Sequence, residues 1–125
     1  MTESESTRLM ERFAAAWNRH DCGALLEMVT EDCVFDAAAG PEPFGTRYCG
    51  REALQAAFSA IWQAFPNASW TEATHFALGD RGFSEWTFRG TRSDGTTVVS
   101  RGIDVFVFRE GRIAYKDTFR KMLAR

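Results

Sequence analysis

The spacing of apolar residues predicts helices in the first half of the chain and strands in the second. Leu9, Phe13 and Trp17 recur at intervals of four, which places them on one stripe of a helix. Thr2, followed three residues later by a glutamate, is typical of a capping box at the start of such a helix. The first helix is therefore expected to run from there to about Asn18.

Two more helices are predicted before the strands begin. Asp21 can cap a short second helix that buries Ala24, Leu25, Met28 and Val29. A short strand is expected at 33–36, and the glycines and prolines of 40–45 read as a loop. A third helix should begin at Gly50 and stop at Pro66, and its apolar stripe is Leu54, Ala57, Phe58, Ile61, Trp62 and Phe65.

Four long strands follow, separated by turn residues such as Gly79-Asp80 and Glu110-Gly111, and they are expected at 68–78, 82–91, 97–108 and 112–120. Consecutive strands joined by tight turns form an antiparallel meander. The sequence therefore predicts an α+β fold, in which three N-terminal helices pack on one face of a strongly curved, mainly antiparallel sheet. Such a cone can hold an internal pocket.

Asp104 lies within the apolar strand segment Ile103-Asp104-Val105-Phe106, where a carboxylate needs a physical reason. Strand alternation places it on one face with Gly102 and Phe106. A carboxyl group framed by aromatic rings is expected to stay protonated near neutrality and can then act as an acid or hydrogen-bond donor. The alternative is an ion pair with Arg101 or Lys116, which would keep Asp104 ionised.

The turns decide what faces Asp104. A three-residue loop at Arg109-Glu110-Gly111 avoids a positive φ at Glu110 and sets Asp104 opposite Lys116, with Thr118 and Arg120 on the same face. A two-residue turn would set Asp104 against Asp117. At 93–95 one register brings Ser84 and Trp86 to the face of Asp104, and the other places Glu85 directly opposite it. Glu85 is thus a candidate second carboxylate.

Composition narrows the class of protein. The 125 residues are 45% hydrophobic and carry a net charge of −2 with scattered basic residues, which suits one domain spanning 1–125 and disfavours nucleic-acid binding. The acidic N-terminus and the lack of a long apolar run favour a cytoplasmic protein rather than a membrane protein. Three cysteines outside paired spacing suit free thiols. No cofactor motif occurs, and the two histidines lack metal-ligand spacing, so neither cofactor nor metal is expected.

Several segments together resemble the nuclear transport factor 2-like superfamily, which includes ketosteroid isomerases, SnoaL-like polyketide cyclases and limonene epoxide hydrolases. The resemblance covers nearly the whole chain. It is carried by W-N-R-H-D-C-G-A-L-L-E-M, E-D-C-V-F-D, G-R-E-A-L, G-T near the end of the second long strand, and I-D-V-F-V-F-R-E-G-R-I at the last hairpin. The order and spacing of these segments imply the cone-shaped α+β fold.

The resemblance also implies roles for single residues. Asp104 matches the protonated aspartic acid with which ketosteroid isomerase binds an oxyanion. The isomerase's oxyanion tyrosine corresponds to Phe13, and its general-base aspartate falls on Ala37, one residue after Asp36. The aspartate of the cyclases and epoxide hydrolases falls on Thr118.

Two functions follow from this reading. The first is a cofactor-independent enzyme that moves protons on a hydrophobic small molecule as an isomerase, cyclase or hydratase, with Asp104 as acid or oxyanion donor and Asp36 or Glu85 as base. The second is a non-catalytic binding module. The candidate ligand contacts are Trp17, Tyr48, Trp62, His75, Trp86, Phe106, Lys116 and Thr118. The apolar strand face of Ile103, Val105 and Val107 predicts a homodimer formed through the sheet.

Overall fold

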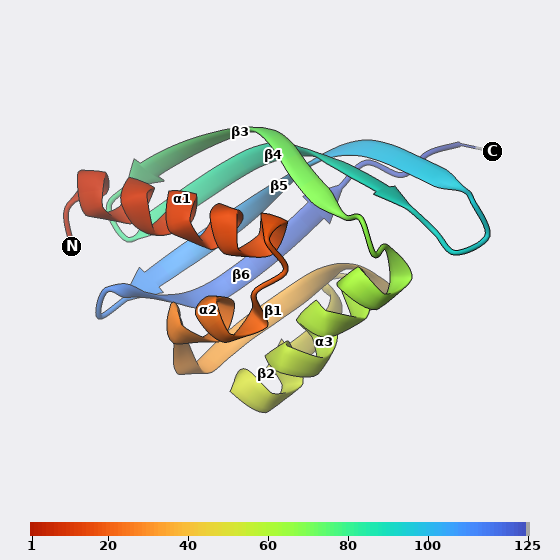
Figure 1. Cartoon of the computed structure of the whole chain (residues 1–125). Helices are drawn as coiled ribbons and strands as arrows, with labels where there is room; N and C mark the ends of the chain where they lie inside the picture. The colour runs from red at the N-terminus through yellow and green to blue at the C-terminus, as the bar shows by residue number, and fades with distance from the viewer. Residues whose placement is uncertain (125) are drawn as a thin grey trace.

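The chain folds into three helices and one six-stranded sheet (Figure 1). Its computed structural model describes residues 1–124. The elements are α1 (Glu3–Asn18), α2 (Cys22–Glu27), β1 (Val29–Glu42), β2 (Gly45–Cys49), α3 (Arg51–Ala64), β3 (Ser69–Leu78), β4 (Arg81–Thr91), β5 (Thr97–Arg109) and β6 (Arg112–Arg120). The last residue, 125, belongs to the predicted domain but lies outside the described residues.

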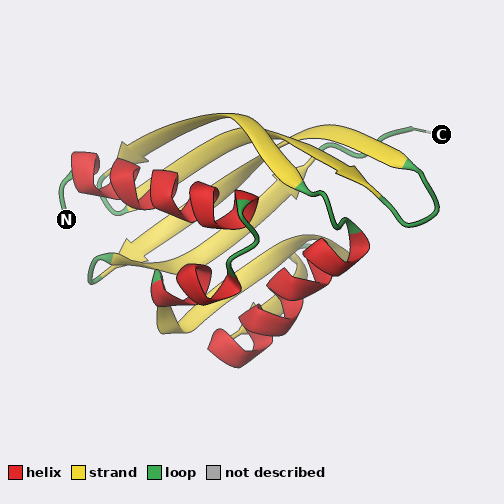
Figure 2. Cartoon of the chain, in the orientation of Figure 1, coloured by secondary structure: helices red, strands yellow, loops and turns green. Residues whose placement is uncertain are grey.

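The six strands form one curved sheet in the order β2-β1-β6-β5-β4-β3, and the helices lie on one side of it (Figure 2). All neighbouring strands are antiparallel except β1 and β6, which run parallel. This arrangement confirms the predicted α+β class and the mainly antiparallel sheet. Within residues 1–124 no helix is long and apolar enough to span a bilayer.

The helix caps follow the sequence signals. Thr2 Oγ1 accepts a hydrogen bond from the backbone N–H of Glu5, and Asp21 Oδ1 accepts one from Ala24 at 3.1 Å. The second helix is shorter than expected, because it ends at Glu27 and Val29 already opens β1.

The predicted loop at 40–45 is wrong, because β1 continues to Glu42 and turns directly into β2. Pro41 is tolerated in β1 because it falls where the pairing with β2 is irregular, between Ala37 and Glu42, and Pro43 lies in the turn. Gly45 has a φ of +80°, and a Cβ atom at this residue would lie 1.9 Å from the carbonyl oxygen of Ala37. This hairpin places Tyr48 in strand β2.

Neither register predicted for β5 and β6 is correct, although the predicted face is. The hairpin has a two-residue turn in which Glu110 takes a φ of +54°, and Arg109 pairs with Arg112. An irregularity beyond Phe108 shifts the pairing by one residue, so Asp104 lies opposite Thr118. Compared with the predicted three-residue loop, the two-residue turn moves the partner of Asp104 by one residue, and the irregularity moves it by one more. A total shift of two residues keeps side chains on the same face of the sheet, so Lys116 and Thr118 still share the face of Asp104.

The pairing of β4 with β5 settles the position of Glu85. Ser84 lies opposite Asp104 and Trp86 opposite Gly102, whereas Glu85 lies opposite Ile103. Strand alternation therefore turns Glu85 to the outer face of the sheet, away from the helices.

Candidate functional site

A cavity of about 350 Å³ lies between the helices and the inner face of the sheet. Small side chains create this space, because eight of the residues that line it are alanines. They come from α1, β1, α3 and β3, and they are Ala14, Ala37, Ala38, Ala39, Ala57, Ala60, Ala64 and Ala73. Aromatic rings cover much of the remaining wall, which suits an apolar ligand.

A row of polar residues crosses the inner face of the sheet in this otherwise apolar wall. His75 of β3 pairs with Ser84 of β4, Ser84 pairs with Asp104 of β5, and Asp104 pairs with Thr118 of β6. All four residues line the cavity. The sheet register thus brings together side chains that are up to 43 positions apart in the sequence, from His75 to Thr118.

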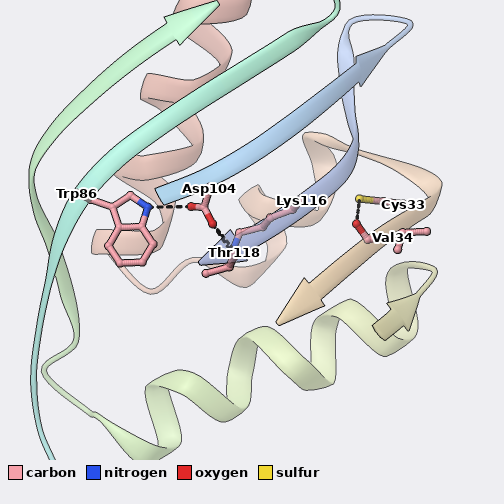
Figure 3. A network of polar contacts seen from close by, with 6 residues as sticks. All are labelled: Cys33, Val34, Trp86, Asp104, Lys116 and Thr118. Carbon is pink, nitrogen blue, oxygen red and sulfur yellow. Dashed lines mark hydrogen bonds and ion pairs between the residues drawn. The ribbon is translucent and has the colours of Figure 1, made fainter. Parts of the chain in front are cut away.

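Asp104 is the centre of a buried hydrogen-bond network (Figure 3). It is 7% exposed, and it accepts hydrogen bonds from Trp86 Nε1 at 3.0 Å, from Lys116 Nζ at 3.0 Å and from the Thr118 hydroxyl. Lys116 Nζ also donates to Thr118 Oγ1 at 2.7 Å, which closes a ring of three polar groups. Three donors on one carboxyl group are the pattern of an ionised carboxylate.

This network revises the role predicted for Asp104. A protonated acid would donate a hydrogen bond into the cavity, but both oxygens of Asp104 accept from protein donors. The alternative drawn from the sequence, an ion pair with Lys116, is the one observed. The group able to donate to a ligand is therefore Lys116 rather than Asp104.

Lys116 is only 5% exposed and its ammonium group is surrounded by aromatic rings. Nζ lies 4.5 Å from the ring centroid of Phe35 and 5.5 Å from that of Trp17. Two of its three hydrogens meet Asp104 and Thr118, and within residues 1–124 no further hydrogen-bond acceptor meets the third. Lys116 also lines the cavity, so its ammonium group is part of the cavity wall.

His75 supplies a second titratable group in the cavity. Its Nδ1 lies 2.7 Å from Ser84 Oγ. In the tautomer that carries the proton on Nδ1, this nitrogen donates to Ser84 and leaves Nε2 as an acceptor. Burial lowers the pKa of His75 below its usual value of 6.5, which favours the neutral imidazole at pH 7.

Three predicted site residues lie outside the cavity formed by residues 1–124: Asp36, Glu85 and Trp62. Asp36 lies in β1 and is fully buried. Arg47 binds it through two hydrogen bonds of 2.8 and 2.9 Å, and Tyr115 donates a third. The Arg47 guanidinium holds the pKa of Asp36 below its usual range. No bulge turns Asp36 to the inner face, so neither Asp36 nor Glu85 can act as a base there.

Trp62 packs in the helical layer instead of lining the cavity. Its ring stacks on His20 at 5.1 Å and lies 5.1 Å from the ring of Trp17. The stripe that suggested a ligand contact is a packing stripe, which is the commoner role of aromatic residues at helical spacing.

The remaining predicted contacts line the cavity: Trp17, Tyr48, His75, Trp86, Phe106, Lys116 and Thr118. Sequence reasoning did not identify Ser84 as a site residue, although one register placed it on the correct face. It also missed the alanines of the wall, since an alanine that borders a cavity looks like any other alanine in a helix or strand.

The buried Cys33 thiol is neither a reactive nucleophile nor part of the Asp104 hydrogen-bond network. Burial raises the pKa of the Cys33 thiol to about 12, which makes it a poor nucleophile. The Cys33 thiol contacts the Val34 carbonyl rather than the Asp104 network (Figure 3). Among the described residues, no three His, Cys, Asp or Glu side chains are grouped to hold a metal ion.

The curved sheet with helices on one face, enclosing a cavity with a polar cluster, defines an α+β cone of the nuclear transport factor 2-like superfamily. Within that class the chain belongs to the SnoaL-like domain family, whose model matches residues 10–116. No curated protein matches the chain.

Solved structures share the fold at low sequence identity. One is a "putative polyketide cyclase" from Xanthomonas campestris, with a TM-score of 0.84, 23% identity, and coverage of 94% of this chain and 90% of the other. An NTF2-like protein of unknown function from Mesorhizobium loti has a TM-score of 0.79, 29% identity and coverage of 96% and 93%. A protein with a ketosteroid isomerase-like fold from Catenulispora acidiphila, in complex with trimethylamine, has a TM-score of 0.79, 19% identity and coverage of 89% and 83%.

Proposed function

We propose that this protein is a cofactor-independent acid–base enzyme that moves a proton on a hydrophobic, carbonyl-bearing small molecule. The observation that carries the proposal is the Lys116–Asp104–Thr118 cluster, which places a buried ammonium group in the wall of an apolar cavity. A preorganised donor in a site with little water stabilises a developing oxyanion far better than water does.

The chemistry divides between Lys116 and His75. Lys116 Nζ donates a hydrogen bond to the carbonyl oxygen of the substrate. His75 Nε2 takes the proton from the carbon next to the carbonyl, and the electron pair of that C–H bond moves to oxygen to give an enolate. In a substrate with a C=C bond between the second and third carbons from the carbonyl, this enolate is a conjugated dienolate. Return of the proton from His75 to the third carbon re-forms the C=O bond, moves the C=C bond next to it, and regenerates neutral His75.

Asp104, Ser84 and Trp86 position these groups without reacting. Asp104 and Thr118 fix the Lys116 ammonium group by hydrogen bonds, and Ser84 holds the His75 ring. Trp86 satisfies the second oxygen of Asp104 at 3.0 Å. The role proposed for Asp104 is therefore to hold the donor, instead of being the donor.

Hydrogen–deuterium exchange tests the proposal without knowledge of the natural substrate. The bicyclic ketone 2-tetralone in D₂O is followed by proton NMR, which measures exchange at the carbon beside the carbonyl. We expect the protein to accelerate exchange, and Lys116→Met and His75→Gln each to reduce the acceleration about 100-fold. Glu85→Gln is the matched control, since Glu85 lies on the outer face.

The alternative function is a non-catalytic binding module, and one observation favours it: the charges of Asp104 and Lys116 already satisfy each other. Binding of 2-tetralone without accelerated exchange would contradict the enzyme and support the module.

We also propose a homodimer formed through the outer face of the sheet. Phe76, Val99 and Phe119 lie on this face and are 52%, 43% and 54% exposed. Light scattering at micromolar concentration should give twice the 14.1 kDa of one chain, and Phe119→Glu should give 14.1 kDa. Phe44→Glu, at the β1–β2 turn, is the control that should remain dimeric. A wild-type mass of one chain would refute the dimer.

A further inference from the structure

Two arginines, Arg92 and Arg120, lie beside one end of the cavity, and neither forms an ion pair with a carboxylate of residues 1–124. Arg120, the last residue of β6, lines the cavity and continues the inward face of Lys116 and Thr118. Its guanidinium carbon lies 4.9 Å from the ring centroid of Phe88. Arg92, just after β4, places its guanidinium carbon 4.6 Å from the ring of Phe65.

The two stacked pairs adjoin each other. The rings of Phe65 and Phe88 meet edge to face at 5.0 Å, and both rings line the cavity. An aromatic corner inside the cavity thus carries a guanidinium on each of its two rings. Cation–π stacking holds each guanidinium near the ring, but it leaves the N–H donors of the guanidinium edge for another partner.

Neither guanidinium at this corner forms an ion pair with a carboxylate within residues 1–124. Five arginines, Arg19, Arg47, Arg51, Arg89 and Arg109, form ion pairs, and Arg92 and Arg120 are among the described arginines that form none. Of these unpaired arginines, Arg120 is the one that lines the cavity. Asp94 lies in the same turn as Arg92, and its Oδ1 accepts a hydrogen bond from the backbone N–H of Thr96. Hydrogen bonds from Thr96 and, to a lesser extent, the charge of Arg92 lower the pKa of Asp94, so Asp94 interacts with Arg92 without forming an ion pair with it. Burial, and to a lesser extent the charge of Arg92, lower the pKa of Arg120.

We infer that the ligand of this cavity is an apolar organic anion, whose ring system occupies the cavity and whose acidic group binds Arg120 and Arg92. The inference rests on the proposed function only in assuming that the cavity binds a hydrophobic small molecule. An anion at this corner would compensate both cations and accept from a planar guanidinium fork, the geometry that suits a carboxylate or sulfonate.

The position of the corner also orients the ligand. Arg120 and Lys116 lie on the same strand four residues apart, which is roughly 13 Å along β6. An anionic group at Arg120 therefore places the far side of a two- or three-ring body near the Lys116–Asp104 cluster. The reacting carbonyl would lie at the end of the ligand opposite its acidic group.

A pair of fluorescent probes tests the inference. The anion 8-anilino-1-naphthalenesulfonate and the neutral N-phenyl-1-naphthylamine share one ring system and differ by a sulfonate. We expect Arg120→Met to weaken binding of the anion about tenfold and to leave binding of the neutral probe unchanged. Arg120→Lys should retain part of the affinity for the anion. Arg81→Met, an exposed arginine at the start of β4 without an ion pair among the described residues, is the matched control.

The possible results separate the two proposals. If both probes bind and Arg120→Met affects neither, or weakens both equally, the anionic ligand is refuted and the hydrophobic cavity stands. If neither probe binds the wild-type protein, ligand binding by the cavity fails, and the inference fails with it. A circular dichroism spectrum of each variant shows whether the protein has kept its fold.

Discussion

Burying an ion pair removes two charges from water, and the pair repays this cost only when each partner is held by further hydrogen bonds. Lys116 and Asp104 meet that condition through Thr118 and Trp86. Keeping this pair in the cavity wall costs folding free energy, because two charges lose their hydration, and a pair of apolar residues would avoid that cost. We attribute the pair to function for that reason.

Lys116→Met should destabilise the fold by about 3 kcal/mol, because it leaves a buried carboxylate without its cation. Urea unfolding measures the loss. The double variant Lys116→Met with Asp104→Leu should recover much of this stability, since no buried charge remains, and Glu85→Gln should change little. A double variant that is less stable than Lys116→Met alone would contradict the argument.

The lowered pKa of His75 gives a prediction with a definite sign. Because burial depresses the folded-state pKa, the neutral base persists to lower pH than in a free histidine. NMR titration of the ring protons should give a midpoint below 6.5, and exchange of 2-tetralone should fall as pH drops through that same midpoint. A midpoint at or above 6.5 would be inconsistent with a buried neutral base.

The positions of single residues show what the sequence could reveal about the site. Asp104 was identifiable because a carboxylate inside an apolar strand is unusual, and Lys116 because alternation placed it on a shared face. The direction of the hydrogen bonds was not predictable, because it depends on side-chain distances across β4, β5 and β6. These hydrogen bonds favour the ion pair with Lys116 over the protonated role that family resemblance suggested for Asp104.

Among the elements, β5 depends on a glycine at one position. A Cβ atom at Gly102 would lie 2.4 Å from Trp86 Cη2 and 2.6 Å from the carbonyl oxygen of Phe119. The missing side chain therefore leaves room for the indole to lie across β5, from which Nε1 donates to Asp104.

Gly102→Ala should accordingly displace Trp86 and destabilise the protein by about 2 kcal/mol. Gly23→Ala is the matched control, because a Cβ at Gly23 has only an ordinary contact of 3.6 Å and alanine favours the helix by about 0.5 kcal/mol. Thermal unfolding followed by tryptophan fluorescence measures both effects. Equal stabilities of the two variants would show that the Gly102 contact relaxes freely.

Helices and long strands were predictable because their apolar periods extend over many residues. The β1–β2 hairpin and the β5–β6 register were not, since each depends on a local exception. Pro41 fits in β1 because the pairing with β2 is irregular there, and Glu110 adopts a positive φ that the sequence argument had disfavoured. A pairing irregularity beyond Phe108 then restored the expected face.

Across the whole molecule, the cavity exists because small residues from several elements meet between the helices and the sheet. Ala57→Phe should fill part of the volume of about 350 Å³ and abolish binding of N-phenyl-1-naphthylamine. Ala56→Phe is the control on the same helix, because Ala56 is exposed and does not line the cavity. Unchanged probe binding by Ala57→Phe would place the ligand elsewhere.

The most direct test of the central claim is the ionisation state of 2-naphthol bound to the protein at pH 7, measured from its absorbance spectrum. Its naphtholate resembles the enolate that Lys116 is proposed to stabilise. The wild-type protein should bind the naphtholate, and Lys116→Met should bind only the neutral naphthol. Neutral naphthol bound to the wild-type protein would contradict an oxyanion site at Lys116.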